Sequence, residues 1–317
     1  MFSRELELRG RAFINYGALS QVEVKDMTID GFPAKLFFNP ARVRSVMADV
    51  SPEALKKRAC FLCPDGLEPL QLTTVWDSPT GQTYFIRVNP FPIFNHHFTI
   101  SSAIHERQTF APHMESMLHL AQAMPEMSIF YNGPMCGASA PDHMHFQAVP
   151  RHSMPIEDHF DTNYANAVLV QESDLQSHLA ALKEVLSMAS IPENASQTGS
   201  LTAGASRTEE WEPRWNIISW YEPESSASVV SDLQGKARST GAADLQPTGR
   251  SYNTIVFFRR ESRPQIFFAP ENERILFSPG TVEMGGVGIV ANRESFDRIT
   301  PEVLRSMIQE VADTLCP

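Results

Sequence analysis

Residues 132–147 read Asn-Gly-Pro-Met-Cys-Gly-Ala-Ser-Ala-Pro-Asp-His-Met-His-Phe-Gln, and this stretch organises the rest of the chain. In an extended segment successive side chains point to opposite faces, so His143, His145 and Gln147 share one face. The two apolar residues between them share the other face, as a strand on an apolar core requires. The pattern therefore predicts a strand whose polar face carries two imidazoles and an amide.

A Gly/Pro/Ser-rich turn separates this strand from an upstream one expected at 129–131. Backbone N–H groups in such a turn can converge on an anion. Two imidazoles and an amide beside the turn suit the handling of a phosphate. The alternative is that both histidines are surface or hydrogen-bonded residues on a half-exposed strand.

The His-x-His-x-Gln string after a Gly-x-Ser-x-Pro turn resembles the transferase branch of the histidine-triad (HIT) superfamily. That branch includes galactose-1-phosphate uridylyltransferase, diadenosine tetraphosphate phosphorylase and GDP-galactose phosphorylase. The whole chain also resembles an uncharacterised bacterial subgroup of the superfamily. The resemblance implies an α+β fold, with a HIT-like antiparallel sheet, flanking helices and two fused HIT-like halves.

Composition narrows the class of protein. The chain has 317 residues, enough for one large domain or two smaller ones with a sizeable core. Its net charge of −11 argues against a nucleic acid or an anionic membrane as partner. No apolar stretch approaches the roughly 20 residues of a membrane span, and the N-terminus lacks the apolar run of a signal peptide. Because four cysteines are too few for a disulfide scaffold, a cytoplasmic protein is expected.

The second half of the chain is predicted to contain no second active site. We expect a catalytic HIT-like half over 1–190, a connection over 191–213 and a second half over 214–317 with a mobile insertion at about 222–250. The last histidine is His178, so the second half has no histidine nucleophile. Periodicity and turn residues predict further elements: a hairpin within 20–47, helices at 113–124, 174–189 and 301–315, strands at 215–221, 252–258, 265–269 and 274–277, and a strand at 287–291 that continues the sheet.

The segment Cys60-Phe-Leu-Cys63 is a candidate metal site. By itself the spacing is ambiguous between a redox pair, a zinc knuckle and coincidence. The Pro-Asp-Gly turn that follows suits a knuckle, and tetrahedral zinc needs two further ligands. In zinc-bearing HIT relatives these are histidines whose positions match His105 and His143 here, with His97 as the substitute for the third ligand. The resemblance implies a structural zinc ion.

Nucleotide-binding candidates also follow from the resemblance. Asn89 and Phe91 lie in a strand–loop–strand segment that holds ribose and base in relatives, while Arg42 and Arg44 follow an Asn-Pro pair near the nucleotide pocket. Further candidates are the turn residues Asn132 and Gly137, and Arg259 and Arg263 for a sugar phosphate. The alternatives are that the arginines are solvated and that Phe91 is a core residue.

The chemistry implied is double displacement at a nucleotide α-phosphorus. His145 attacks as neutral imidazole and forms a nucleotidyl-histidine intermediate. Ser139 and the turn stabilise growing charge, and Gln147 holds a non-bridging oxygen. The backbone around His143 positions the nucleophile. Asp142 departs from the pattern, since the first histidine directly follows the proline in relatives.

The amide of Gln147 indicates which molecule accepts the nucleotidyl group. Hydrolytic members carry a third histidine there, so the amide favours transfer to phosphate or a sugar phosphate. The expected partners are a nucleotide or nucleotide sugar with one of those acceptors, and a homodimer is possible. A nucleotide hydrolase and a nucleotide-binding protein without turnover remain as alternatives.

Overall fold

The computed structural model describes residues 12–43, 50–64, 71–134, 136–189, 212–223, 249–259, 266–269 and 273–312. Most of the expected connection and insertion, together with Arg44 and Arg263, lies outside these residues. The division of the chain into two halves therefore stays a prediction.

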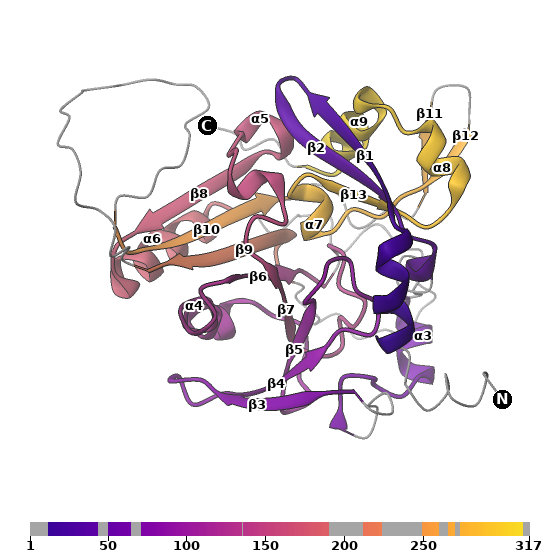
Figure 1. Cartoon of the computed structure of the whole chain (residues 1–317). Coiled ribbons are helices and arrows are strands. Elements are labelled where there is room, and N and C mark those ends of the chain that lie inside the picture. The colour runs from indigo at the N-terminus through magenta and orange to yellow at the C-terminus, as the bar shows by residue number, and fades with distance from the viewer. Residues whose placement is uncertain are drawn as a thin grey trace, which may run out of the picture.

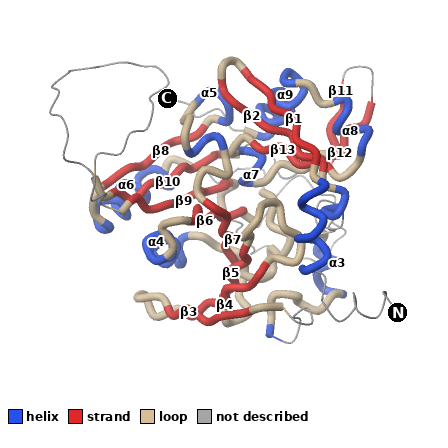
Figure 2. Tube along the Cα trace, in the orientation of Figure 1, coloured by secondary structure: helices blue, strands red, loops and turns tan. Residues whose placement is uncertain are grey.

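An antiparallel sheet of eight strands runs through the protein (Figures 1 and 2). Its order is β3-β4-β5-β7-β6-β9-β10-β8, and every neighbouring pair is antiparallel. The strands are β3 (Thr73–Asp77), β4 (Thr83–Val88), β5 (Phe98–Ser102), β6 (Met127–Asn132), β7 (His145–Pro150), β8 (Ala167–Glu172), β9 (Trp215–Glu222) and β10 (Ser251–Phe258). The large antiparallel sheet with flanking helices confirms the predicted α+β class. The edge strand β8 has no counterpart among the predicted strands.

Each face of the sheet packs against its own apolar core, because neighbouring residues of a strand face opposite ways. In β9, for example, Ile217 belongs to one core and Ile218 to the other. The first core is covered by α4 (Met114–Ala123) and α6 (Leu175–Ser187), which confirms both predicted helices. The second lies toward α7 (Thr281–Met284), α8 (Arg293–Arg298), α9 (Pro301–Val311) and a smaller sheet.

The smaller sheet corrects one prediction. The hairpin of β1 (Glu23–Ile29) and β2 (Phe32–Phe38) forms as expected, joined by a two-residue turn with positive φ at both residues. However, β13 (Val287–Val290) pairs in parallel with β2 and so does not continue the main sheet. Because every residue of β13 is apolar, this strand could be buried equally well in the main sheet or in the smaller one. Its sequence therefore could not specify which strand it pairs with. The strands β11 (Ile266–Ala269) and β12 (Glu273–Leu276) pair only with each other in the part of the chain described.

The remaining short helices among the described residues include the N-terminal helix (residues 12–18), α3 (Pro52–Lys57), α5 (Thr162–Ala165), and the 3₁₀ turns η1 (Leu19–Gln21), η2 (Pro40–Arg42), η4 (Ala111–His113) and η5 (Pro155–Glu157). The side chains of Ser51, Asp174 and Thr300 accept backbone hydrogen bonds at the starts of α3, α6 and α9, as is typical of N-cap residues. Every helix among the described residues is too short or too polar to cross a lipid bilayer.

Candidate functional site

The His-x-His-x-Gln segment enters the middle of the main sheet. Strand β7 begins at His145 and lies between β5 and β6. His145 is paired with Ser101, and Gln147 is paired with Thr99 and Phe130. The intervening apolar residues are fully buried in the core beneath α4. The polar side chains of the strand therefore lie on the opposite face, as the alternation predicts.

Hydrogen bonding defines the tautomer of His145. Its Nδ1 lies 2.9 Å from the backbone oxygen of His143. A carbonyl oxygen only accepts, so Nδ1 carries the proton and donates it. The described residues provide no hydrogen-bond partner for Nε2, which keeps its lone pair. This is the form in which an imidazole is a nucleophile.

Burial keeps His145 in that form. The side chain is 3% exposed. Burial lowers the pKa of His145 to about 4, although its hydrogen bond to the His143 backbone acts in the opposite direction. The ring is therefore neutral at neutral pH.

A buried glutamine clamps the backbone of His145. Gln108 accepts from the N–H of His145 at 2.7 Å and donates to its carbonyl oxygen at 2.9 Å. The same amide nitrogen donates to the oxygen of Asn132, at the end of the neighbouring strand. Gln108 thus bridges β6 and β7 where they diverge into the turn. The sequence reasoning missed this residue, which lies outside every motif.

The turn over 133–142 leaves donors available. Among the described residues, no partner meets the N–H of Ser139 or of Ala140, and the Ser139 side chain is half-buried. Gly137 has a φ of +110°, and a Cβ there would lie 2.8 Å from the Cα of Gly280. Close packing against the start of α7 therefore requires glycine at 137.

The C-terminal part of the chain supports this turn. The side-chain oxygen of Asn132 accepts from the N–H of Thr281 at 2.8 Å, from its hydroxyl at 2.7 Å, and from Asn216 at 2.9 Å. Arg259 is 2% exposed and donates to the oxygens of Cys136 and Pro279. Arg259 is therefore not the solvated arginine of the alternative interpretation. These contacts favour structural roles for Asn132 and Arg259, whose predicted substrate contacts stay predictions.

Gln147 belongs to a small network of its own. Its side-chain oxygen lies 2.8 Å from Nε2 of His97 and 3.4 Å from the amide nitrogen of Asn89. Asn89 also donates to the hydroxyl of Thr99, and its oxygen accepts from the N–H of Phe91 at 2.8 Å. The structure thus brings Asn89 beside Gln147, as expected for two residues of one site.

Arg42, Asn89 and Phe91, the predicted nucleotide-binding residues that lie within the described part of the chain, are close together in the structure. Arg42 donates to the carbonyl oxygen of Phe91. Its charge is near enough to His97 to help lower the pKa of that ring. From the N-terminal helix, the Tyr16 hydroxyl both donates to the carbonyl of His97 and accepts from its N–H, and Asn15 donates to Pro90. Hydrogen bonds from the N-terminal helix therefore hold the 89–97 loop in place beside Gln147.

Four side chains of the kinds that bind metals lie together just before the start of β7. The ligand atoms of Cys60, Cys63, His105 and His143 all lie within 4.8 Å of one another. The Sγ of Cys60 is 3.2 Å from Nδ1 of His143, and the Sγ of Cys63 is 3.3 Å from Nδ1 of His105. Tetrahedral zinc with ordinary bond lengths separates its S and N ligands by about 3.6 Å. The cluster could hold a metal, and the histidine that lies in it beside His143 is His105, whereas His97 lies elsewhere.

The protonation states also fit a metal. Nε2 of His143 lies 2.9 Å from the carbonyl oxygen of Ser102 and donates to it, so Nδ1 is the ring nitrogen that faces Cys60. Nδ1 donates to the Cys60 thiolate here, and it would bind a metal after losing its proton. Burial alone would raise the pKa of Cys60, but hydrogen bonds to His143 and to backbone groups lower it to about 6. The buried guanidinium of Arg87, which donates to the oxygen of Leu62, adds positive charge near the two thiols.

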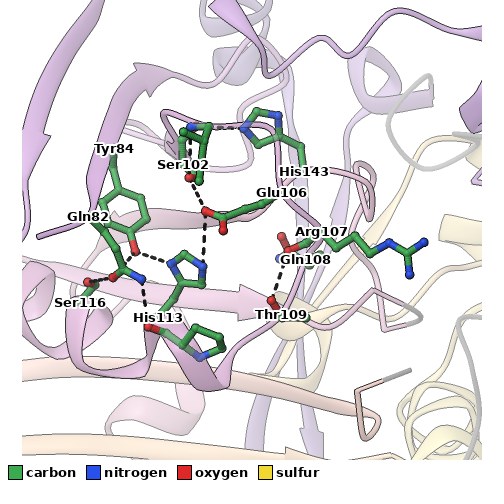
Figure 3. A network of polar contacts seen from close by, with 12 residues as sticks. Gln82, Tyr84, Ser102, Glu106, Arg107, Gln108, Thr109, His113, Ser116 and His143 are labelled. Carbon is green, nitrogen blue, oxygen red and sulfur yellow. Dashed lines mark hydrogen bonds and ion pairs between the residues drawn. The ribbon is translucent and has the colours of Figure 1, made fainter. Parts of the chain in front are cut away.

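A network that looks catalytic continues from the cluster (Figure 3). The Ser102 hydroxyl donates to Glu106 at 2.5 Å, Glu106 lies 3.5 Å from His113, and His113 lies 2.6 Å from the Tyr84 hydroxyl. However, Tyr84 is fully buried, His113 is 1% exposed, and burial raises the pKa of the phenol. A substrate cannot reach Tyr84 and His113, although the Glu106 side chain is 33% exposed, so we interpret the arrangement as structural.

Comparison with known proteins supports the fold. The sequence profile of a family described as Domain of unknown function (DUF4922) matches residues 1–150. A search among curated proteins finds no match. Solved structures of yeast Ap4A phosphorylase Apa2 are similar along almost the whole chain. The first is 14% identical with a TM-score of 0.50, covering 95% of this chain and 93% of that chain.

Two further structures of the yeast enzyme agree. Its complex with Ap4A is 12% identical with a TM-score of 0.52, covering 95% of this chain and 96% of that chain. Its complex with AMP is 13% identical with a TM-score of 0.53, covering 95% of each. That enzyme is an Ap4A phosphorylase, one of the kinds of enzyme named in the sequence resemblance, so the fold agrees with that resemblance.

Proposed function

We propose that this protein is a nucleotidyltransferase or nucleotide phosphorylase of the transferase branch of the HIT superfamily. The observation that carries the proposal is the hydrogen bond from Nδ1 of His145 to the backbone oxygen of His143. It leaves Nε2 as an unprotonated nucleophile on the strand face that also carries Gln147, and in the preceding turn the N–H groups of Ser139 and Ala140 have no partner among the described residues. The names of the similar structures, a phosphorylase in complex with Ap4A and with AMP, support a nucleotide as substrate.

In the proposed reaction, Nε2 of His145 attacks the α-phosphorus of a bound nucleotide. The P–N bond forms as the bond to the leaving oxygen breaks, and the leaving phosphate or sugar phosphate takes the electron pair. An acceptor oxygen, from phosphate or a sugar phosphate, then attacks the phosphorus and releases the imidazole. Because a phosphate leaving group needs no general acid, the site can work without an ionisable residue at 147.

The other residues bind and orient. The Ser139 hydroxyl and the turn N–H groups donate to oxygens that gain charge in the transition state, and the amide of Gln147 holds a non-bridging oxygen. Asn89, Phe91 and Arg42 are the proposed contacts for the nucleoside. These roles rest on their common position around the 89–97 loop and on the sequence resemblance.

We also propose that the cluster of Cys60, Cys63, His105 and His143 binds zinc. Two thiolates and two imidazoles form a donor set typical of structural zinc sites. When bound, the ion supplies a structural link between the 58–64 segment and the start of β7. It takes no part in the transfer.

The test is product analysis with purified protein. Nucleotide sugars and dinucleoside polyphosphates are incubated with and without inorganic phosphate, and products are separated by anion exchange. We expect a nucleoside diphosphate product that requires phosphate and is lost in His145→Asn, while the control His119→Asn on α4 keeps the activity. A nucleoside monophosphate formed without phosphate would indicate a hydrolase. Binding without any product, when a sugar phosphate has also been supplied as acceptor, would indicate a nucleotide-binding protein.

A further inference from the structure

The two ends of the Gln147 side chain are chemically opposite. Its NH₂ group donates to a phosphate oxygen, whereas its carbonyl oxygen would repel one. Rotation by 180° about the last side-chain bond exchanges them. A glutamine therefore serves a phosphate site only if something fixes which end faces the phosphate.

His97 can fix it, because the tautomer of its ring is itself determined. The backbone N–H of Ile93 lies 3.1 Å from Nδ1 of His97 and can only donate. Nδ1 is therefore the acceptor, and Nε2 carries the proton of the neutral ring. That proton is directed at the side-chain oxygen of Gln147, 2.8 Å away. With the amide reversed, an N–H would face an N–H.

A second donor reinforces this orientation. The amide nitrogen of Asn89 lies 3.4 Å from the same oxygen of Gln147. The oxygen of Asn89 is engaged by the N–H of Phe91, so the end that faces Gln147 is its donor. Both neighbours of Gln147 thus donate to its oxygen. The described residues leave its NH₂ group without a protein partner.

The surroundings hold His97 rigidly and keep it neutral. The ring is fully buried and packs near Phe130 on β6. The Tyr16 hydroxyl contacts both backbone groups of His97, which ties the residue to the N-terminal helix. Burial lowers the pKa of His97 to about 3, helped by the charge of Arg42, although the hydrogen bond to Gln147 raises it.

We propose that His97 is a positioning residue that orients the Gln147 amide, with its NH₂ group toward the phosphate that His145 attacks. This inference rests on the proposed function for its consequence in catalysis. The orientation itself follows from donors and acceptors alone. It accounts for a buried histidine that is not a ligand of the metal cluster.

The kinetic test compares two substitutions of similar size. His97→Gln retains an N–H donor at about the reach of Nε2, whereas His97→Met retains the volume without a donor. We expect His97→Met to lower kcat roughly 10–100-fold with KM changed less than about threefold, as for other orienting residues behind a reactive group. His97→Gln should recover most of that loss. Equal losses in both variants, or no loss in His97→Met, would overturn the proposal.

A double-mutant cycle shows whether His97 acts through Gln147. In a Gln147→Ala background the substitution His97→Met should cause no further loss of kcat, because there is no amide left to orient. Losses that multiply would show that His97 acts by another route. Unfolding midpoints of all variants are recorded, and Tyr84→Phe serves as a control that is destabilised outside the site.

An NMR measurement is independent of turnover. Long-range ¹H–¹⁵N correlation of the histidine rings, with His97→Gln for assignment, reports the tautomer directly. We expect the Nε2–H form for His97, unchanged between pH 8 and pH 5. A ring protonated at Nδ1, or one that titrates in this range, would overturn the inference even in an active protein. If no nucleotide is turned over but the tautomer is as expected, the proposed function fails and the orientation stands.

Discussion

Nδ1 of His145 lies 2.9 Å from the backbone oxygen of His143, while the ring of His143 faces Cys60. The candidate nucleophile and the candidate metal ligand are therefore joined through one carbonyl group. Whatever fixes His143 also fixes the acceptor that selects the tautomer of His145. Under the proposed function, a metal bound at the cluster would support catalysis by fixing the position of His143.

Metal content is the first consequence. We expect about one zinc ion per chain by mass spectrometry of the purified protein. Substitution His105→Ala should lose the metal and lower the unfolding temperature by roughly 5 °C or more, since 1 kcal/mol corresponds to about 2–4 °C in domains of 150–250 residues. The control His119→Ala, which removes a histidine outside the cluster, should change neither property. Full metal content in His105→Ala would contradict this ligand set.

Substitution of Gln108 should affect both stability and catalysis. Gln108→Leu leaves the N–H of His145 and the carbonyl oxygens of His145 and Asn132 without their partner. Each buried group left unsatisfied costs about 1–3 kcal/mol. We expect a lower free energy of unfolding in urea, and a kcat reduced more strongly than KM is raised. A variant that is destabilised but has an unchanged kcat would show that the clamp does not position His145.

The buried Tyr-His-Glu arrangement should prove structural. Tyr84→Phe removes the hydroxyl that meets Nδ1 of His113. We expect a loss of about 1–3 kcal/mol in the free energy of unfolding, with kcat within about twofold of the original. Denaturant unfolding and steady-state kinetics on the same preparation measure both. A large loss of kcat without loss of stability would mean that substrate reaches this network.

Much of the fold could be predicted from the sequence, because the signals are local. Caps at Ser51, Asp174 and Thr300 and the 3.6-residue periodicity over 113–124 depend on neighbours within a few positions. The alternation at His143, His145 and Gln147 is equally local. The pairing of β13 was predicted wrongly, because the sequence of an apolar strand does not indicate which neighbouring strand it will pair with.

The supporting residues of the site could not be predicted, because their roles depend on approach from distant parts of the chain. Gln108 contacts a backbone 37 positions away, and Tyr16 contacts His97 across 81 positions. His97 drew attention only as a metal ligand, through its place in a pair of histidines. In the structure its ring meets Gln147, and His105 takes the place at the cluster.

A buried histidine remote from the site predicts an effect of pH on stability. Burial lowers the pKa of His178 to about 4, from an ordinary value near 6.5. The unfolded chain thus binds a proton more readily, so the stability present above pH 6.5 is lost as pH falls toward 4. His178→Leu should make the fall in unfolding temperature between pH 7 and pH 5 shallower. Thr254 keeps Ser219 as a partner, so little change is expected at pH 7.5.

That measurement uses thermal unfolding followed by circular dichroism at several pH values. His97 and His145 are also buried with lowered pKa values, so part of the acid sensitivity should remain in the variant. A pH dependence as steep as that of the original protein would contradict the prediction for His178.

The central claim is that His145 carries the nucleotide in a covalent intermediate. The most direct test is brief incubation with a nucleotide substrate in the absence of acceptor, alkaline quenching, proteolysis and peptide mass spectrometry. We predict a nucleoside monophosphate group on the peptide that contains His145, discharged on addition of phosphate or a sugar phosphate and absent in His145→Asn. An adduct on another residue, or turnover of the same substrate with an unmodified His145, would contradict the account.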